Sequence, residues 1–578
     1  MSLIKEFLKN NNFDYFILPN SDEFFSEYVP QSQKRIQEIS GFTGSNALII
    51  FSKNKNYFFT DGRYLLQAKN EIDTTQFDII NIADQSPISW LKNNVKADSN
   101  LAIDPKITSK KFIDECEKFI PKITFLQENP VKIEHSDSIE FAKKVFQISD
   151  KIAGESYLSK INRILPKIQF DGIFISKPEN LNWLLNIRGD DIKFTPIFLA
   201  HCVLLKSGKL VIFSNKKYFQ EIEIPQNVEI VEIENINSNL NNYLPKKLTL
   251  QTDFSSTNYW TYEHFENHQI KMINGTCPIE LTKALKNITE INGAIKSHNL
   301  DAVAMIKFLH WLHQATNHKI EINEIIVAEK ILEFRKFSKY FKFPSFETIA
   351  GYASNGAIIH YKATKSSNKI IERNNLLLID SGGQYFGDDF MGTTDITRTI
   401  CVGTPTQEMI DDYTRVLKGH INLARTKFPR GTTGANLDGI ARFHLWNDEK
   451  DYEHGTGHGV GAFASVHEGP YSISKKSQLA IQEGVFLSNE PGYYKTNDYG
   501  IRLENIMVAQ SYSNLMLEFK TLTLVPFELK LINFKMLTYP EKKWLKEYHQ
   551  KIILEIGELL EYTEFNWLCN TYSLKEII

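Results

Sequence analysis

The sequence contains few cysteines and lacks a disulfide pattern. Only five cysteines occur among 578 residues, and none lies in CxxC spacing. A disulfide framework or a zinc–thiolate site is therefore not expected, because scattered free cysteines of this kind are typically small buried hydrophobes. The five are Cys116, Cys202, Cys277, Cys401 and Cys569.

Long apolar runs and an excess of one charge are also missing. No stretch of roughly 18 apolar residues occurs, so a membrane-spanning helix is not expected. The 66 Lys and Arg nearly balance the 69 Asp and Glu, which argues against nucleic acid or an anionic membrane as a partner. Lys5, Glu6 and Lys9 interrupt the first apolar run where a secretory signal would be continuous, so we expect a cytoplasmic protein.

Glycine is scarce except in one window, where 19 of the 29 glycines lie between residues 351 and 500. Because glycine permits tight turns and close backbone approach, we expect the functional loops there. Ahead of this window, Phe13-Asp14 and Phe170-Asp171 each precede an apolar run, at an offset of about 150 residues. That offset is a domain length and predicts two related α/β domains. Two unrelated domains with similar strand patterns are the alternative.

The chain is therefore predicted to be α/β, with domains over residues 1–145, 146–285 and 286–578. Helical spacing of apolar residues predicts one long helix over 278–312 at the start of the third domain. Short strands are expected after it, among them one over 357–360.

Acidic and imidazole residues recur at the ends of predicted strands in the third domain. Asp380 closes an apolar run, and Asp395 lies in GTTDITRT; HGTGHGVG follows at 454–461, SNEPGYY at 488–494 and GIRLEN at 500–505. Carboxylates together with imidazole suit Mn, Zn, Fe or Co, and a bridging carboxylate allows two ions about 3.5 Å apart. Two cations flanking one water would lower its pKa and hold the resulting hydroxide against a carbonyl, so no nucleophilic Ser or Cys is needed. Taken singly, an Asp, Glu or His at such a position is more often a turn cap or a solvated side chain. Their occurrence together in these motifs favours a metal site.

The glycines inside HGTGHGVG predict a loop rather than a helical pair of histidines. An interior glycine costs a helix about 1 kcal/mol. We expect these glycines to bring the backbone close to a substrate.

These motifs resemble those of the pita-bread metallopeptidases, which include methionyl aminopeptidase, prolidase and aminopeptidase P. The resemblance is carried by DSGGQY, GTTDITRT, HGTGHGVG, SNEPGYY and GIRLEN. It extends to ISGFTGSNALIIF and FTDGRYLLQA near the start, NGAIIHY in the middle and TLTLVPFELKLI near the end, as in the long three-domain Xaa-Pro aminopeptidases of cytosolic type. The resemblance implies two creatinase-type α/β domains followed by a pita-bread domain, whose curved antiparallel sheet is covered by helices.

The resemblance also implies the metal ligands. Two divalent ions, most often Mn²⁺ with Zn²⁺ or Co²⁺ as alternatives, would be held by Asp380, Asp395, His458, Glu490 and Glu504. Asp395 and Glu504 would bridge both ions, His458 would bind one, and Glu490 would also handle the proton of the attacking water.

Four further residues receive roles by the same resemblance. His454 and His467 would line the site and steady the substrate carbonyl and the oxyanion. His360 would lie near the scissile bond, and Arg502 would orient Glu504 or a neighbouring carboxylate.

One departure from the family pattern concerns the two aspartates. Asp395 follows Asp380 by 15 residues, a longer separation than the family has, and the extra residues fall between Gly383 and Gly392. A longer hairpin leaves both strand ends in place, so Asp380 is kept as a ligand. In the alternative register Asp388 or Asp389 is the ligand; otherwise these acids line the mouth of the site or form a solvated turn.

The reaction implied is metal-dependent hydrolysis of the bond between a peptide's first residue and a following proline. Proline lacks an amide N–H and has a rigid ring, so a dedicated apolar pocket is expected, with Ile359, Tyr493 and Tyr494 as walls. A metal and Asp380 would bind the free amine. The alternatives are a prolidase restricted to dipeptides and a metal-free peptide-binding module. The expected partners are peptides with a penultimate proline and a second copy of the chain in a homodimer.

Overall fold

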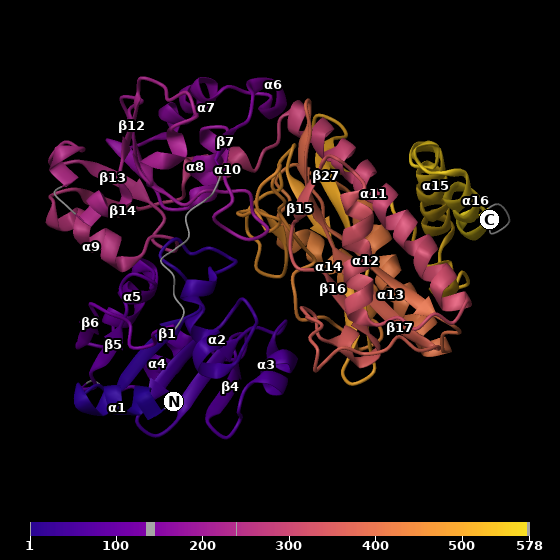
Figure 1. The fold of residues 1–578 in the computed structure, drawn as a ribbon, viewed down its shortest axis with the longest axis horizontal. Helices are drawn as coiled ribbons and strands as arrows, with labels where there is room; N and C mark the ends of the chain where they lie inside the picture. The colour runs from indigo at the N-terminus through magenta and orange to yellow at the C-terminus, as the bar shows by residue number, and fades with distance from the viewer. Residues whose placement is uncertain (1, 97, 134–144, 238–239, 575–578) are drawn as a thin grey trace. The chain divides into compact units, whose positions relative to one another are not determined.

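The computed structural model describes residues 2–96, 98–133, 145–237 and 240–574 and divides the chain into two compact units. The N-terminal unit comprises Met1–Ser149 with Glu155–Thr282, and the C-terminal unit comprises Asp150–Gly154 with Lys283–Ile578. Helices and strands are mixed in both units (Figure 1), which confirms the predicted α/β class.

Two six-stranded sheets of the same topology form the frame of the N-terminal unit. Their strand orders are β4-β3-β2-β1-β5-β6 and β12-β11-β10-β8-β13-β14. The central strand of each, β1 or β8, pairs antiparallel with β2 or β10 and parallel with β5 or β13. Phe13-Asp14 directly precedes β1 and Phe170-Asp171 directly precedes β8, so the sequence repeat falls on equivalent strands.

The strands of the first sheet are β1 (Tyr15–Pro19), β2 (Leu48–Ser52), β3 (Asn56–Thr60), β4 (Phe77–Asn81), β5 (Leu101–Ile103) and β6 (Ile123–Phe125). The strands of the second sheet are β8 (Gly172–Ile175), β10 (His201–Leu205), β11 (Leu210–Phe213), β12 (Val228–Val231), β13 (Thr249–Thr252) and β14 (Lys271–Asn274). Every residue of β8, β10 and β11 is buried, as in a sheet that is covered on both faces. The short strands β7 (Phe146–Gln147) and β9 (Ile187–Arg188) form a separate pair.

The helices of the N-terminal unit are α1 (Ser2–Asn10), α2 (Arg35–Ser40), α3 (Leu65–Glu71), α4 (Pro87–Asn94), α5 (Lys110–Glu117), α7 (Tyr157–Ile164), α8 (Pro178–Leu184) and α9 (Tyr259–Asn267). Helix α10 (Pro278–Lys283) ends where the C-terminal unit resumes.

The strand pairs of the C-terminal unit are antiparallel. Its sheets have the orders β15-β18-β19, β16-β17-β20, β21-β28-β27-β24, β22-β23 and β25-β26. The strands are β15 (Phe341–Pro344), β16 (Ile349–Tyr352), β17 (Asn375–Ser381), β18 (Gly383–Phe386), β19 (Met391–Thr393), β20 (Ile396–Val402), β21 (Lys427–Pro429), β22 (Gly457–His458), β23 (Ser472–Ile473), β24 (Phe486–Asn489), β25 (Gly492–Lys495), β26 (Tyr499–Arg502), β27 (Asn505–Ser511) and β28 (Met516–Thr521).

Helices pack on these sheets within the C-terminal unit, and apolar residues from both share one large core. The helices are α6 (Asp150–Ala153), α11 (Ile288–Asn317), α12 (Glu324–Lys336), α13 (Gln407–Ala424), α14 (Gly434–Trp446), α15 (Tyr539–Glu555) and α16 (Tyr562–Tyr572). In Figure 1, the last two, in yellow, lie beside α11. The single helix predicted over 278–312 is instead the two helices α10 and α11, because Asn287 and Glu290 form a capping box that starts α11.

The strand predicted over 357–360 is wrong. A 3-10 helix, Ala353–Ala357, ends there and is followed by a turn. Two contacts favour this shape: the Asn355 amide donates to the buried Glu324 carboxylate at 3.0 Å, and Gly356 lies so close to Gly500 that a Cβ would come within 3.2 Å of its nitrogen.

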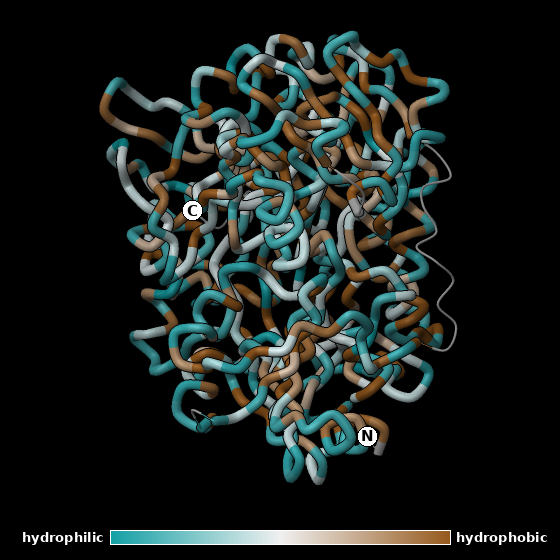
Figure 2. The backbone as a smooth tube through the Cα atoms, turned by 90° about the vertical axis from the view of Figure 1, so that its left-hand side faces the viewer, coloured by the Kyte–Doolittle hydropathy of each residue, from teal (hydrophilic) through white to brown (hydrophobic). Residues whose placement is uncertain are grey.

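No helix among the described residues is long and apolar enough to cross a membrane. Figure 2 shows the reason: hydrophobic stretches, in brown, are short and alternate with hydrophilic ones.

Candidate metal centre

Two antiparallel strands bring the predicted aspartates to one end of a sheet. Strand β17 pairs with β20 in a register that sets Asp380 opposite Thr397. Asp395 immediately precedes β20, so both carboxylates lie at the same end of this pair. The longer hairpin between them is taken up by β18 and β19, which pair with each other and leave the two strand ends together.

The predicted glutamates are brought together in the same way by a second pair of strands. Strand β24 pairs with β27, with Asn489 opposite Asn505. Glu490 follows β24 and Glu504 precedes β27, so these carboxylates also share one end. The Glu504 amide donates to the Thr397 carbonyl at 3.1 Å, which joins this end to β20.

His458 reaches the carboxylates from the glycine-rich segment, which is not helical, as predicted. Its glycines also have a role within the fold, which leaves the predicted approach to a substrate as a prediction. A Cβ at Gly457 would lie 2.0 Å from the Ser488 carbonyl oxygen, and one at Gly459 would lie 2.1 Å from that of Glu468. These glycines therefore let neighbouring backbone segments pack against His458.

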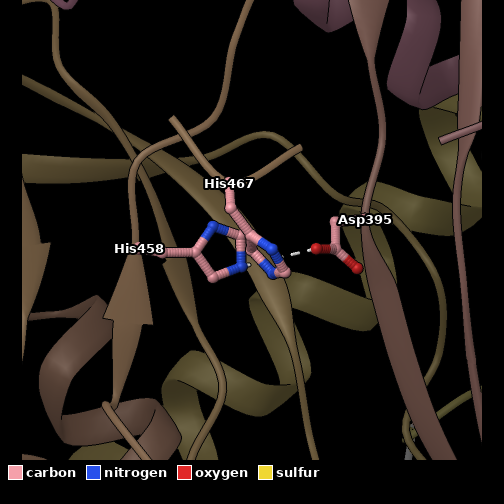
Figure 3. Close-up of side chains that lie close together, drawn as sticks. All are labelled: Asp395, His458 and His467. Carbon is pink, nitrogen blue, oxygen red and sulfur yellow. Dashed lines mark ion pairs between the residues drawn. The ribbon is translucent and has the colours of Figure 1, made fainter. Parts of the chain in front are cut away.

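Six side chains converge at this point of the C-terminal unit. Their potential ligand atoms form three overlapping groups, within each of which the atoms lie no more than 4.8 Å apart. The groups are Asp395, His458 and His467; His458, Glu490 and Glu504; and Asp380, Asp395 and Glu504. All five predicted metal ligands belong to the groups, and His467 joins them. Figure 3 shows the rings of His458 and His467 edge to face, beside Asp395.

The hydrogen bonding of the carboxylates fits a metal centre. One oxygen each of Asp380 (Oδ1), Asp395 (Oδ1) and Glu504 (Oε1) is buried without a hydrogen-bond partner. Buried polar atoms normally have partners, so such a cluster of orphaned acceptors offers a place for a cation. Carboxylate oxygens with imidazole are the donors that Mn²⁺, Zn²⁺ and Co²⁺ accept, and the residues present therefore fit two divalent ions.

The electrostatics of the cluster show the same need for positive charge. Burial raises the pKa of Asp380 to about 7 against the opposing effect of Arg502. Burial and the charges of Asp395 and Glu490 raise the pKa of Glu504 well above its usual value. Burial lowers the pKa of His458, but its hydrogen bond to the Asp395 carboxylate and the charge of Glu490 outweigh burial and raise the value to about 9. These carboxylates crowd one another and attract a cation.

Arg502 hydrogen-bonds to the carboxylate cluster and fixes the position of two of its members. Its guanidinium donates to Asp380 Oδ2 at 2.7 Å and to the Thr397 hydroxyl at 3.2 Å. That hydroxyl donates in turn to Glu504 Oε2 at 2.7 Å. Arg502 thus positions Asp380 directly and Glu504 through Thr397. Its donation to the Ile359 carbonyl, at 3.3 Å, places the segment before His360 beside it.

Tyr493 and Tyr494, the two tyrosines predicted to line the proline pocket, point to opposite faces of strand β25. Adjacent residues of strand β25 point to opposite faces. The Tyr494 hydroxyl accepts from Arg502 at 2.7 Å and lies 2.8 Å from His454 Nε2, so it belongs to the site. The ring of Tyr493 instead lies 5.1 Å from the Lys450 ammonium, and its role as a wall of the proline pocket stays a prediction. His454 also approaches Glu490, with Nδ1 4.0 Å from Oε2.

The hairpin acids lie outside the cluster. Asp389 is exposed and forms an ion pair with Lys296 at 2.8 Å, and Asp388 is also exposed. Neither belongs to the ligand groups found among the described residues.

Two contributors were missed by the sequence reasoning, although both lie inside quoted motifs. Thr397 of GTTDITRT bridges Arg502 and Glu504. Ser488 of SNEPGYY donates to Glu490 Oε1 at 3.0 Å and accepts from the His458 amide at 2.8 Å. The only available signal was their place beside predicted ligands, because a serine or threonine in such a motif does not by itself indicate a role in orienting a ligand.

The fold and this carboxylate–imidazole cluster define a class, the two-metal hydrolases. The chain matches the profile of metallopeptidase family M24 over residues 293–511 and that of the C-terminal region of this family over 515–573. Creatinase/prolidase N-terminal domain profiles match residues 2–131 and 138–290.

The sequence and the fold are similar to those of known Xaa-Pro aminopeptidases over nearly the whole chain. Xaa-Pro aminopeptidase 1 of Dictyostelium discoideum is 35% identical, over 98% of this chain and 95% of that protein. The crystal structure of X-prolyl aminopeptidase from Caenorhabditis elegans, described as a cytosolic enzyme with a di-nuclear active site, superposes with a TM-score of 0.90 and 29% identity, over 97% of this chain and 95% of the other. A Xaa-Pro dipeptidase from Bacillus anthracis shares the fold over 65% of this chain and 99% of its own, with a TM-score of 0.52 and 22% identity.

This chain belongs to metallopeptidase family M24, among the Xaa-Pro aminopeptidases. It is a hydrolase, and the predicted family and fold class are confirmed: creatinase-type and pita-bread domains make up the chain.

Proposed function

We propose that this protein is an aminopeptidase that removes the first residue from peptides whose second residue is proline. The observation that carries the proposal is the similarity to Xaa-Pro aminopeptidases along the whole chain, whereas the dipeptidase match leaves about a third of the chain uncovered. The full-length match favours this activity over that of a prolidase.

Two divalent ions, Mn²⁺ in our proposal, would be held by the ligands named from the sequence. These are Asp380, Asp395, His458, Glu490 and Glu504, and Asp395 and Glu504 each belong to two of the three ligand groups. A bound pair of divalent cations supplies Lewis acidity, which lowers the pKa of water and polarises a carbonyl. The three orphaned carboxylate oxygens support this assignment.

The chain's own groups would supply the remaining parts of the reaction. Glu490 would accept a proton from water on one carboxylate oxygen, and Ser488 orients that carboxylate by donating to Oε1. His467 would donate to the oxyanion of the tetrahedral intermediate. His454, held by Tyr494, would orient the substrate carbonyl, and His360 would act near the scissile bond.

Asp380 would bind the free amine of the substrate together with a metal. Arg502 occupies Oδ2 of this carboxylate and leaves Oδ1 without a partner. An amine held by Asp380 and a metal would make the enzyme an exopeptidase.

A comparison of four peptides tests the proposal on the Mn²⁺-loaded protein: X-Pro-Y, X-Ala-Y, X-Pro and acetyl-X-Pro-Y. We expect cleavage of X-Pro-Y after its first residue. X-Ala-Y should react at least about 10- to 100-fold more slowly, since it would bury an unpaired N–H that costs about 1–3 kcal/mol. Acetylation should abolish cleavage. Fast cleavage restricted to X-Pro would indicate a prolidase, and binding of the peptides without cleavage would indicate a peptide-binding module.

We further propose a cytoplasmic location and a homodimer. The first is supported by the relative described as cytosolic, and the second by the resemblance stated from the sequence. Fractionation of cells and light scattering of the purified chain test the two, and a monomer in solution would refute the second.

A further inference from the structure

The fully buried Arg398 contacts both the metal cluster and the C-terminal region, residues 515–573. Arg398 lies on β20 with no exposed surface. A guanidinium presents five N–H donors and is costly to bury unless these are satisfied. Its recorded acceptors are all neutral oxygens: the carbonyls of Thr397, Glu504, Val525 and Pro526, the Asn505 side-chain amide and the Tyr548 hydroxyl.

On one side, Arg398 fixes the backbone of a predicted metal ligand. A single guanidinium nitrogen, Nη1, donates to the Glu504 carbonyl at 2.6 Å and to the Thr397 carbonyl at 2.8 Å. Thr397 in turn binds Glu504 twice, through its carbonyl at 3.1 Å and through its hydroxyl at 2.7 Å. One Glu504 carboxylate oxygen is thereby fixed, and the other, Oε1, stays without a partner.

On the other side, Arg398 is held by the segment that follows β28 and by helix α15. Nη2 donates to the Val525 carbonyl at 2.6 Å and to the Tyr548 hydroxyl at 3.1 Å. The guanidinium carbon lies 4.4 Å from the centre of the Phe527 ring. Residues 515–573, which include all of these partners, match the C-terminal region profile that follows the catalytic profile in this family.

The Tyr548 hydroxyl is the point where helix α15 meets this network. It donates to the Val525 carbonyl at 2.9 Å or the Thr523 carbonyl at 3.0 Å, and it accepts from Arg398 and from the Val525 amide. A hydroxyl that both donates and accepts fixes the segment and the guanidinium relative to each other.

We propose that the C-terminal region is a functional part of the metal centre, with Tyr548 and Arg398 as positioning residues that hold Glu504 in a ligating geometry. This inference rests on the proposed function, which takes Glu504 as a metal ligand. Residues behind metal ligands typically contribute 10- to 100-fold to metal affinity or activity. We therefore expect the Tyr548 hydroxyl to contribute about 10-fold to the affinity for the more weakly bound ion.

Tyr413 offers a matched control. It is also buried in the C-terminal unit, and its hydroxyl also binds the segment after β28, accepting from the Glu528 amide at 3.0 Å. Its recorded hydrogen bond does not involve Arg398. Tyr413→Phe therefore removes a comparable buried hydroxyl without removing a bond to the guanidinium.

The experiment compares the wild type, Tyr548→Phe and Tyr413→Phe, each loaded with Mn²⁺. Loss of Mn²⁺ to a competing chelating dye gives the dissociation constant of each ion, and the cleavage rate of X-Pro-Y is measured at rising Mn²⁺. We expect Tyr548→Phe to bind one ion about 10-fold more weakly, with cleavage restored by excess Mn²⁺. Tyr413→Phe should keep wild-type affinity. Arg398→Lys, which keeps the charge but loses the guanidinium fork, is the second variant and should show the same weakening.

The outcomes separate the two proposals. If the wild type binds two ions and cleaves the peptide, and Tyr548→Phe and Arg398→Lys bind them as tightly as Tyr413→Phe does, the inference is overturned and the proposed function stands. If the wild type binds no Mn²⁺, both are overturned.

Discussion

The central strands of the second N-terminal sheet and the strands around the metal cluster bury different kinds of side chain. Strands β8, β10 and β11 of the N-terminal unit are buried throughout and apolar apart from His201. In the C-terminal unit, the ends of buried strands carry charge: Asp395, Arg398, Arg502 and Glu504 are at most 4% exposed. A buried charge costs stability unless it is paired, so such a concentration indicates chemistry rather than folding.

Buried charge without a partner marks the functional part of this chain more clearly than buried apolar strands do. The N-terminal unit repeats one sheet topology with apolar cores, as expected of a scaffold. The C-terminal unit contains the orphaned carboxylate oxygens of Asp380, Asp395 and Glu504.

Glu504→Ala should have the largest effect, because it removes a carboxylate that two of the three ligand groups share. We expect loss of at least one metal ion per chain and a fall in activity of more than about 100-fold, since even residues behind the ligands contribute 10- to 100-fold. Elemental analysis and peptide cleavage measure these losses. Hydrogen exchange in β8 and β10 should stay unchanged, and wild-type metal content with full activity would refute the role of Glu504.

His467→Ala separates an oxyanion donor from a ligand. His467 lies in a ligand group with Asp395 and His458, although the sequence resemblance places it outside the ligand set. With a donor role, the variant keeps two ions and its kcat falls about 100-fold or more. Loss of an ion would make His467 a ligand instead. His444→Ala, at a half-buried histidine bonded to Asn422, is the control.

His201 gives the N-terminal unit a pH dependence of its own. Burial between Phe24 and Phe174 lowers its pKa to about 4. The unfolded chain, with a histidine pKa near 6.5, binds the extra proton first, so stability falls as pH drops from about 7 towards 4, by at most about 2–3 kcal/mol. His201→Phe should flatten this part of the curve, as measured by denaturant unfolding at several pH values. An unchanged pH dependence would show that His201 is not its source.

Asp389→Asn should have the smallest effect, because this exposed carboxylate pairs with Lys296 at the surface and such pairs contribute little. Metal content and activity should match the wild type. The same substitution at buried Asp380 should lose metal. The reverse result would favour the alternative register of the hairpin.

Much of the site followed from the sequence, because its residues lie in long motifs at strand ends. Asp380, Asp395, Glu490 and Glu504 come together because two antiparallel pairs end at the same place. The register itself could not be predicted from alternating burial, because β17, β20 and β24 are buried along almost their whole length.

What could not be predicted depends on contacts between distant segments. The bridge from Tyr548 to Arg398 spans 150 residues. Arg398 lies in the quoted motif GTTDITRT, but nothing local marks Tyr548 as its partner. The strand expected over 357–360 fails for the same reason, since Glu324 and Gly500 decide the local shape. That Tyr493 and Tyr494 point to opposite faces could be inferred only once residues 492–495 were known to form strand β25.

The central claim is that one cluster of buried carboxylate and imidazole groups in the C-terminal unit holds two metal ions that the activity requires. Elemental analysis of the protein after loading with Mn²⁺ and removal of free ion tests it most directly. We predict about two ions per chain, with X-Pro-Y cleavage lost on chelation and recovered on reloading. A content near zero, with cleavage surviving a strong chelator, would contradict the account.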